Sequence, residues 1–172
     1  MSSTFVPPDF EVPRQWRNEQ FWLWPLTSAD LDEDHAAVLE SQAELHAVFS
    51  PHHDWPAPQI TRDEDRRDLA RHERDFAERT GFAYVIGSAD GQHYLGCCYL
   101  YATTKPYDVR AYFWLRSSQR TAAREEEVLR ALKSWLTTAW PFQKVAFPGR
   151  TIPWDEWRAL PPPEPPPFTG EG

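Results

Sequence analysis

The sequence predicts an α+β (α/β) domain in which a mixed sheet is flanked by helices. Apolar residues recur with a helical period in some segments, and they alternate or form short runs, as strands do, in others. The segments follow the order strand, helix, helix, three closely spaced strands, helix and strand. At 172 residues the chain is long enough for one hydrophobic core.

The N-terminal half is expected to supply one strand and two helices. Residues 21–26 form the strand, and the capping-box-like run Thr27–Asp30 begins the first helix. This helix should run for about five turns, because its apolar residues recur about every seven positions: Leu31, Val38, Leu45 and Phe49. A proline-rich run at 51–58 ends it. The second helix begins at a capping box, Thr61 to Glu64, carries a narrow apolar stripe on a charged surface, and stops near Gly81.

Three strand-like runs then follow at residues 82–86, 94–101 and 109–115. Their short connections predict an antiparallel meander. In the last run we expect the face of Val109 to be buried and the face of Arg110 to be more open to water. A helix at about 122–139 and a short strand at 144–147 complete the order.

Cys97 and Cys98 are adjacent in the second of these strand-like runs. Successive strand residues point to opposite faces of a sheet, so the two thiols are poorly placed to bond to each other. We expect reduced cysteines that pack in the core.

Charge and composition exclude several kinds of partner. The net charge of −8 argues against a nucleic-acid surface, which needs clustered Lys and Arg. No apolar run reaches the ~20 residues of a membrane span, and no signal peptide is visible, so we expect a cytoplasmic protein that does not enter a membrane. The run His52-His53-Asp54 lacks metal-ligand spacing, and no metal is predicted.

Proline marks the two ends of the chain. We expect an N-terminal arm at 1–20, a folded body at 21–158 and a proline-rich tail at 159–172. The run 161–167 favours a polyproline II conformation, which aromatic grooves on other proteins recognise. A stiff spacer is one alternative, and a strap laid over the protein's own Trp154 and Trp157 is the interpretation we favour.

The order of elements over about 21–147 resembles the GNAT (GCN5-related N-acetyltransferase) superfamily. Particular phrases are similar to those of a group of bacterial GNAT-like proteins: Phe82-Ala-Tyr84, Leu95-Gly-Cys97, Val109 to Trp114, Trp140-Pro-Phe142 and Pro148-Gly-Arg150. The resemblance implies the GNAT-like acyl-CoA N-acyltransferase fold. In that superfamily another helix and two closing strands normally follow the strand at 144–147, so the fold is expected to be C-terminally truncated here.

The resemblance also implies a site for acetyl-CoA, the acyl donor. The superfamily binds the pyrophosphate of acetyl-CoA at a Q/R-x-x-G-x-G/A turn before the long helix, where backbone N–H groups and the helix N-terminus face the anion. In this chain the residues implied in binding the cofactor are Arg116, Arg120, Ala122, Ala123 and Arg124. Glu125 stands where the closing Gly or Ala is expected. Either Glu125 repels the phosphates, an effect that Arg116, Arg120 and Arg124 would offset, or Glu125 to Glu127 simply complement the helix dipole.

Two residues of the strand at 109–115 and its approach are the candidate catalytic residues. Acyl transfer needs a base for the incoming amine, and Asp108 and Tyr112 are placed to serve. The function predicted is therefore transfer of an acetyl or acyl group to a small-molecule amine, at reduced or lost activity. The alternative is a non-catalytic GNAT-like domain that binds a small ligand or a protein partner. A homodimer or the tail is expected to cover the open sheet edge.

Overall fold

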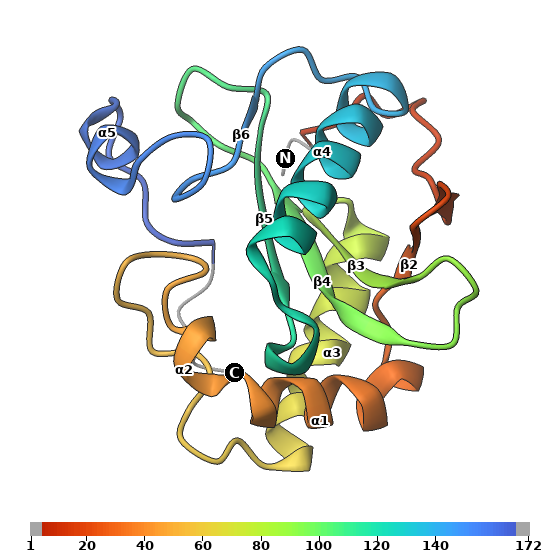
Figure 1. The fold of residues 1–172 in the computed structure, drawn as a ribbon. Helices are drawn as coiled ribbons and strands as arrows, with labels where there is room; N and C mark the ends of the chain where they lie inside the picture. The colour runs from red at the N-terminus through yellow and green to blue at the C-terminus, as the bar shows by residue number, and fades with distance from the viewer. Residues whose placement is uncertain (1–4, 168–172) are drawn as a thin grey trace.

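The computed structural model describes residues 5–167, and these form one mixed sheet with helices on both faces (Figure 1). The sheet has six strands in sequence order: β1 (Trp16–Arg17), β2 (Phe21–Pro25), β3 (Gly81–Ser88), β4 (Tyr94–Tyr101), β5 (Val109–Leu115) and β6 (Val145–Ala146). Neighbouring strands are antiparallel except β5 and β6, which are parallel. The predicted α+β architecture, the meander β3–β4–β5 and the short strand after the long helix are confirmed.

The helices are α1 (Leu31–Glu40), α2 (Gln42–Leu45), α3 (Arg62–Glu78), α4 (Ala122–Thr138) and α5 (Trp154–Ala159). One continuous first helix of about five turns is wrong, because the chain leaves helical geometry at Ser41. Ser41 is fully buried, and its hydroxyl accepts the N–H of Ser117 at 3.0 Å. This contact ties the break between α1 and α2 to the turn that follows β5.

Helix α3 ends two residues earlier than a stop at Gly81 would place it. Arg79 adopts the left-handed conformation at φ 61°, and Gly81 already belongs to β3. The Arg79 guanidinium donates hydrogen bonds to the carbonyls of Pro7 at 2.7 Å and Phe10 at 2.9 Å. The end of α3 therefore holds the N-terminal segment.

Both faces of the sheet are buried. Helix α4 lies in front of the sheet in Figure 1, and α3 lies behind it. Side chains of β5 alternate between the two cores, with Val109 and Phe113 in one and Tyr112 and Trp114 in the other. The expectation that the face of Arg110 is more open to water is wrong, because α1, α2 and Phe49 cover it.

The segment before residue 20, expected as an arm, packs against the body from Phe5 onward. It supplies β1, and Val6 is only 1% exposed. The carbonyl of Pro13 accepts the hydroxyl of Tyr84 at 2.7 Å. These contacts cover the sheet edge at β2.

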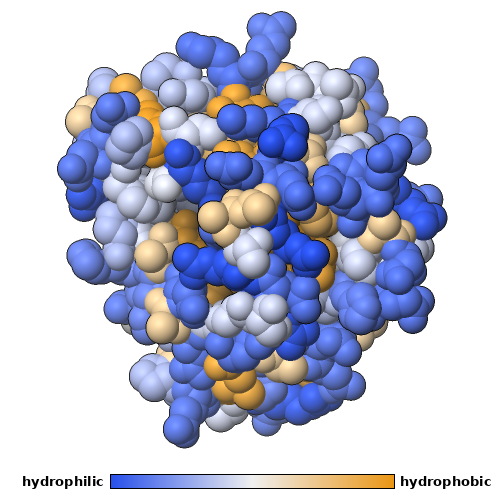
Figure 2. All heavy atoms as spheres, viewed as in Figure 1, coloured by the Kyte–Doolittle hydropathy of each residue, from blue (hydrophilic) through white to orange (hydrophobic). Residues whose placement is uncertain are grey.

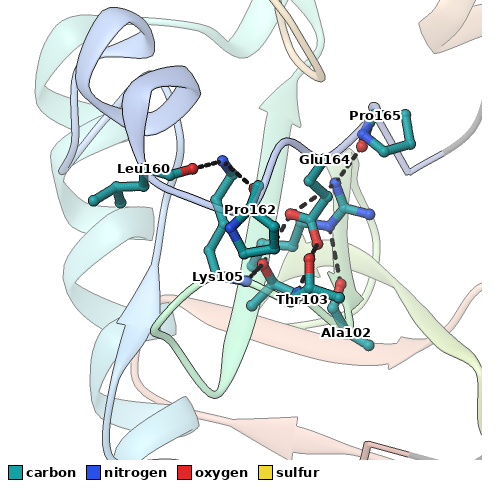
Figure 3. A network of polar contacts seen from close by, with 9 residues as sticks. Ala102, Thr103, Lys105, Leu160, Pro162, Glu164 and Pro165 are labelled. Atoms are coloured by element: carbon teal, nitrogen blue, oxygen red, sulfur yellow. Dashed lines mark hydrogen bonds and ion pairs between the residues drawn. The ribbon is translucent and has the colours of Figure 1, made fainter.

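The proline-rich tail, as far as Pro167, also lies on the body. Leu160 packs with the aromatic cluster that contains Trp154 and Trp157, which agrees with a strap. The stronger contacts, however, join residues 160–165 to the loop between β4 and β5 (Figure 3). Residues 168–172 of the predicted tail lie outside the described part of the chain.

The two cysteines are free and buried, as predicted. Cys97 belongs to the core under α1 and Cys98 to the core under α4. The adjacent thiols thus face opposite sides of the sheet.

Hydrophilic residues cover most of the face seen in Figure 2, with small apolar patches scattered between them. Within residues 5–167, no helix has the length and apolar character needed to cross a membrane. Leu39, at 41% exposure, is the exposed large hydrophobic side chain of this region.

Candidate functional site

A cavity of about 230 Å³ lies where β5 ends and α4 begins. One wall is apolar and comes from the α2 segment and the end of β5, whereas the rim is charged. The wall and rim include Leu45, Val48, Trp114, Glu44, Arg120, Glu125 and Arg150. The cavity therefore lies at the turn where the resemblance to the GNAT superfamily implies the acetyl-CoA pyrophosphate.

The cavity exists because β5 and β6 separate. The two strands pair only at Val109–Arg110 and Val145–Ala146. Beyond this point the turn at Gly149, with φ 81°, directs Arg150 back toward β5. The Arg150 guanidinium stacks 3.6 Å from the ring centroid of Phe113, and its Nη2 donates to the Phe113 carbonyl at 2.9 Å. Arg150 thus occupies the opening between the strands.

The charges at the rim are paired. One carboxylate oxygen of Glu125 lies 3.4 Å from Arg120 Nε and 3.5 Å from Arg150 Nη1. Glu44 lies 3.9 Å from Arg120 Nη1 and accepts the Ser117 hydroxyl at 3.1 Å. Burial lowers the pKa of Arg150, and the Glu125 carboxylate acts in the opposite direction. The Glu125 carboxylate thus lies within ion-pair distance of two guanidinium groups at the rim.

Helix α4 begins at the cavity with an ordinary side-chain cap. Thr121 Oγ1 accepts the N–H of Arg124 at 3.1 Å, and the Thr121 carbonyl accepts the N–H of Glu125. Ala122 and Ala123 are exposed in the first turn, where a helix provides no partners for backbone N–H groups. These two N–H groups are available to a ligand.

The structure separates the residues that the sequence implied in cofactor binding. Arg120 lines the cavity, and Ala122 and Ala123 lie in the adjoining turn. Arg116 instead forms ion pairs with Glu40 and, at 3.7 Å, with Glu33. Arg124 donates to the side chain of Gln119 at 2.7 Å and lines a different hollow.

Asp108 lies at the other end of β5. Leu115 is seven positions further along the chain, and this separation corresponds to roughly 23 Å in an extended strand. Its Oδ2 accepts the N–H groups of Gln143 at 2.8 Å and Lys144 at 2.7 Å, and these hydrogen bonds lower the pKa of Asp108. In this position the carboxylate holds the chain that leads into β6.

Tyr112 lies in the middle of β5 and is 2% exposed. Its ring packs 5.3 Å from that of Phe49 and 6.4 Å from that of Tyr101. Burial raises the pKa of Tyr112 to about 12, although Arg110 opposes the shift. Neither Asp108 nor Tyr112 lines the cavity, and their catalytic roles stay predictions.

Sequence reasoning missed Glu44 and Arg150. Glu44 lies on a four-residue helix that the sequence merged with α1, and Arg150 follows a short strand whose separation from β5 no pattern reveals. The phrase Pro148-Gly-Arg150 was a usable signal, because a glycine directly after a strand often allows a turn with positive φ.

The run His52-His53-Asp54 is part of the loop after α2. Trp55 donates its N–H to His53 Nδ1 at 3.0 Å, and the His53 ring packs 5.7 Å from Phe49. Within residues 5–167, no three histidine, cysteine or acidic side chains gather as a metal site would require.

Comparison with known proteins detects a likeness in structure alone. No protein-family model and no curated protein sequence matches the chain. Among solved structures it resembles RimL, the ribosomal L7/L12 alpha-N-protein acetyltransferase in complex with coenzyme A, with a TM-score of 0.56 and 17% identity over 73% of this chain and 66% of that one. It also resembles the ribosomal-protein-S5-alanine acetyltransferase of Vibrio fischeri (TM-score 0.57, 12% identity, 75% and 69% covered).

A third similar structure is the microcin C7 self-immunity acetyltransferase MccE in complex with acetyl-CoA and AMP. Its TM-score is 0.55 and its sequence identity 9%, and the match covers 72% of this chain and 67% of that one. All three are acetyltransferases. The chain spans just under two thirds of the length of the RimL chain. At these identities the likeness confirms the GNAT fold that the sequence implied.

Proposed function

We propose that the protein is a GNAT-type N-acyltransferase that takes acyl-CoA as donor and a small amine as acceptor, with its activity restrained by Glu125. One observation carries this proposal. Two arginines from separate segments, Arg120 and Arg150, converge on a single carboxylate at the N-terminus of α4, beside a cavity between diverging strands. This is the arrangement of an anion site.

The donor phosphates would take the place of the Glu125 carboxylate. The N–H groups of Ala122 and Ala123 and the guanidinium groups of Arg120 and Arg150 would hold them. Glu125 opposes this, because two unit charges ~4 Å apart repel by about 1 kcal/mol in water-like dielectric. We therefore expect weaker donor binding than a turn of glycines would give.

Glu44 is the carboxylate at the rim that we assign to the acceptor. An ammonium group would be attracted to it and would first lose one proton to water, because only the neutral amine has a lone pair that can attack the thioester carbon. The nitrogen would lose a second proton, to the Glu44 carboxylate or to water, as the amide forms. The carbon–sulfur bond then breaks, and the thiolate leaves without needing a buried acid, because a thiol of pKa ~8.5 is a good leaving group near neutral pH.

Calorimetry with acetyl-CoA tests the donor site. We expect the wild type to bind more weakly than the micromolar range and Glu125→Gln to bind about tenfold more tightly, a gain of about 1.4 kcal/mol. Glu126→Gln is the matched control, since it removes the same charge from an exposed position on the same helix. It should change the affinity by less than about twofold.

If the wild type bound acetyl-CoA tightly and Glu125→Gln did not change the affinity, the proposal that Glu125 weakens donor binding would be refuted. Absence of binding to both proteins would refute the donor site. If donor binding is present, release of free thiol should be assayed with small amines and with peptides that have a free α-amine. The peptides represent the protein acceptors named for RimL.

A non-catalytic ligand-binding domain remains the second candidate function. The observation that favours it is that Asp108 and Tyr112 are both engaged in structural contacts away from the cavity. Acetyl-CoA binding without thiol release for any amine would decide for this alternative. Loss of thiol release in Glu44→Gln at unchanged donor affinity would decide for catalysis.

A further inference from the structure

The tail carries an acidic side chain that is almost completely enclosed. Glu164 is only 7% exposed in its side chain, although the prolines on either side of it are exposed. It is held by a set of donors on the β4–β5 loop and β5 (Figure 3), namely Thr103 Oγ1 at 2.8 Å, Thr104 N at 2.7 Å, Thr104 Oγ1 at 3.2 Å and Arg110 Nη1 at 3.5 Å. These donors form a carboxylate cradle.

Two buried cations, Arg110 of the cradle and the neighbouring Lys105, hold the main chain of the tail. Lys105, at 4% exposure, donates to the carbonyls of Leu160 and, at 3.0 Å, Pro162. Arg110, at 8% exposure, donates to the carbonyls of Pro165 at 2.8 Å and Ala102 at 3.0 Å. A buried cation without partners is strongly unfavourable, and in this structure the tail supplies most of the acceptors for these two cations.

The contacts are made to groups that any acidic, proline-rich peptide offers, namely main-chain carbonyls and a carboxylate. Proline has no backbone N–H, and a proline-rich segment therefore offers its carbonyls as acceptors with few competing donors. The cradle and Lys105 together bind three tail carbonyls and one carboxylate, while the proline rings on either side of Glu164 stay exposed. Nothing in this recognition requires that the peptide belong to the same chain.

We propose that Thr103, Thr104, Lys105 and Arg110 form a binding site for an extended peptide with a glutamate between prolines on a partner protein, and that the chain's own residues 160–165 are its resident competitor. Charge complementarity supports an acidic partner, because the buried Arg110 pairs with the carboxylate of the resident segment at 3.5 Å and the buried Lys105 binds its carbonyls. The tether gives the resident segment a high effective concentration, so a partner must bind in competition with it.

Fluorescence polarisation on the 172-residue chain tests this with a labelled peptide, Leu-Pro-Pro-Pro-Glu-Pro-Pro-Pro, and its Glu→Gln counterpart. Glu164→Gln keeps the shape of the resident side chain but removes its charge, and Glu156→Gln removes a charge from an exposed site on α5. We expect Glu164→Gln to bind the Glu peptide about tenfold more tightly than the wild type does, and Glu156→Gln to behave as the wild type. The Gln peptide should bind about tenfold more weakly, and added salt should weaken the Glu peptide.

Hydrogen exchange at the Thr104 amide locates the binding. This amide donates to Glu164, so its exchange should accelerate in Glu164→Gln and slow again when the Glu peptide is added. If a thermal melt shows that Glu164→Gln is unfolded, titration of the wild type to high peptide concentration replaces it. Equal affinity for the Glu and Gln peptides, or no binding to any folded variant, would overturn the proposal. So would a wild-type dimer that becomes monomeric in Glu164→Gln, because the cradle would then hold a second copy's tail.

Discussion

Helix α4 covers one face of the sheet with apolar side chains, whereas α1 and α3 bury three carboxylates and a histidine on the other. The first face packs Val128, Leu132, Trp135 and Leu136 against aromatic strand residues such as Tyr84, whose ring meets Trp135 edge-on at 4.9 Å. The second contains Asp34, Asp65, Asp68 and His72. The two faces have similar burial but different chemistry.

The face of the sheet under α1 and α3, called the polar face below, buries ionisable groups, and burial disfavours their charged forms. Burial raises the pKa of Asp34 and Asp68, and burial together with repulsion from Asp34 raises the pKa of Asp65 to about 9. Burial also lowers the pKa of His72 to about 3. Some carboxylates on this face have partners, since Asp34 accepts the Tyr94 hydroxyl and Asp68 accepts the Trp55 indole N–H at 2.9 Å. We therefore expect the stability contributed by the polar face to depend on pH more strongly than that contributed by the face under α4.

The largest expected effect comes from the apolar face. Leu132→Asp should lower the free energy of unfolding by about 4 kcal/mol or more, because it buries an unpaired charge where Leu132 is 3% exposed. Ser134→Asp adds the same charge at an exposed position on α4 and should cost less than about 1 kcal/mol. Chemical denaturation measures both. Similar stabilities for the two variants would contradict the placement of α4.

An effect of opposite sign is expected on the polar face. The pKa of Asp65 rises from 3.8 to about 9 on folding, so the folded state keeps a proton that the unfolded state releases. The stability due to this proton is fully present below about pH 4 and is lost as the pH rises toward 9. Asp65→Asn should therefore raise the free energy of unfolding at pH 7.5 by on the order of 1–2 kcal/mol and flatten its decline between pH 5 and 9.

Asp63→Asn is the control for this measurement. Asp63 is exposed in the first turn of the same helix and pairs with Arg66 at the surface. Its substitution should cost at most about 0.5 kcal/mol and leave the pH profile unchanged. An Asp65→Asn profile parallel to that of the wild type would show that Asp65 is ionised in the folded protein.

The smallest effect compares two adjacent residues, one on each face. Cys98→Ser places a hydroxyl in the apolar core beside Tyr84, whereas Cys97→Ser places one where Tyr94 Oη lies 2.9 Å from the sulfur and Asp34 Oδ1 lies 3.6 Å from it. We expect Cys98→Ser to be less stable than Cys97→Ser by about 1 kcal/mol in denaturant titrations. The reverse order would mean that the polar face cannot accommodate another hydroxyl.

The sequence by itself determined the local elements and their order. Period, caps and turns depend on neighbours in the chain, and the patterns around Leu132, Thr61 and Val109 identified α4, α3 and β5. The turn at Arg120, which borders the cavity, came instead from the resemblance to the GNAT superfamily.

Only the tertiary structure decided which charges meet. Glu125 touches Arg150, 25 positions along the chain, and Glu164 sits on Thr104, 60 positions away. The hydrogen bond between Ser117 and Ser41 at the end of the first helix is also a tertiary contact. So is the packing of Phe49 against the buried Tyr112. The physical reason is that burial, pairing of charges and desolvation depend on distances in space, whereas hydrophobic periodicity and capping depend on separations along the chain.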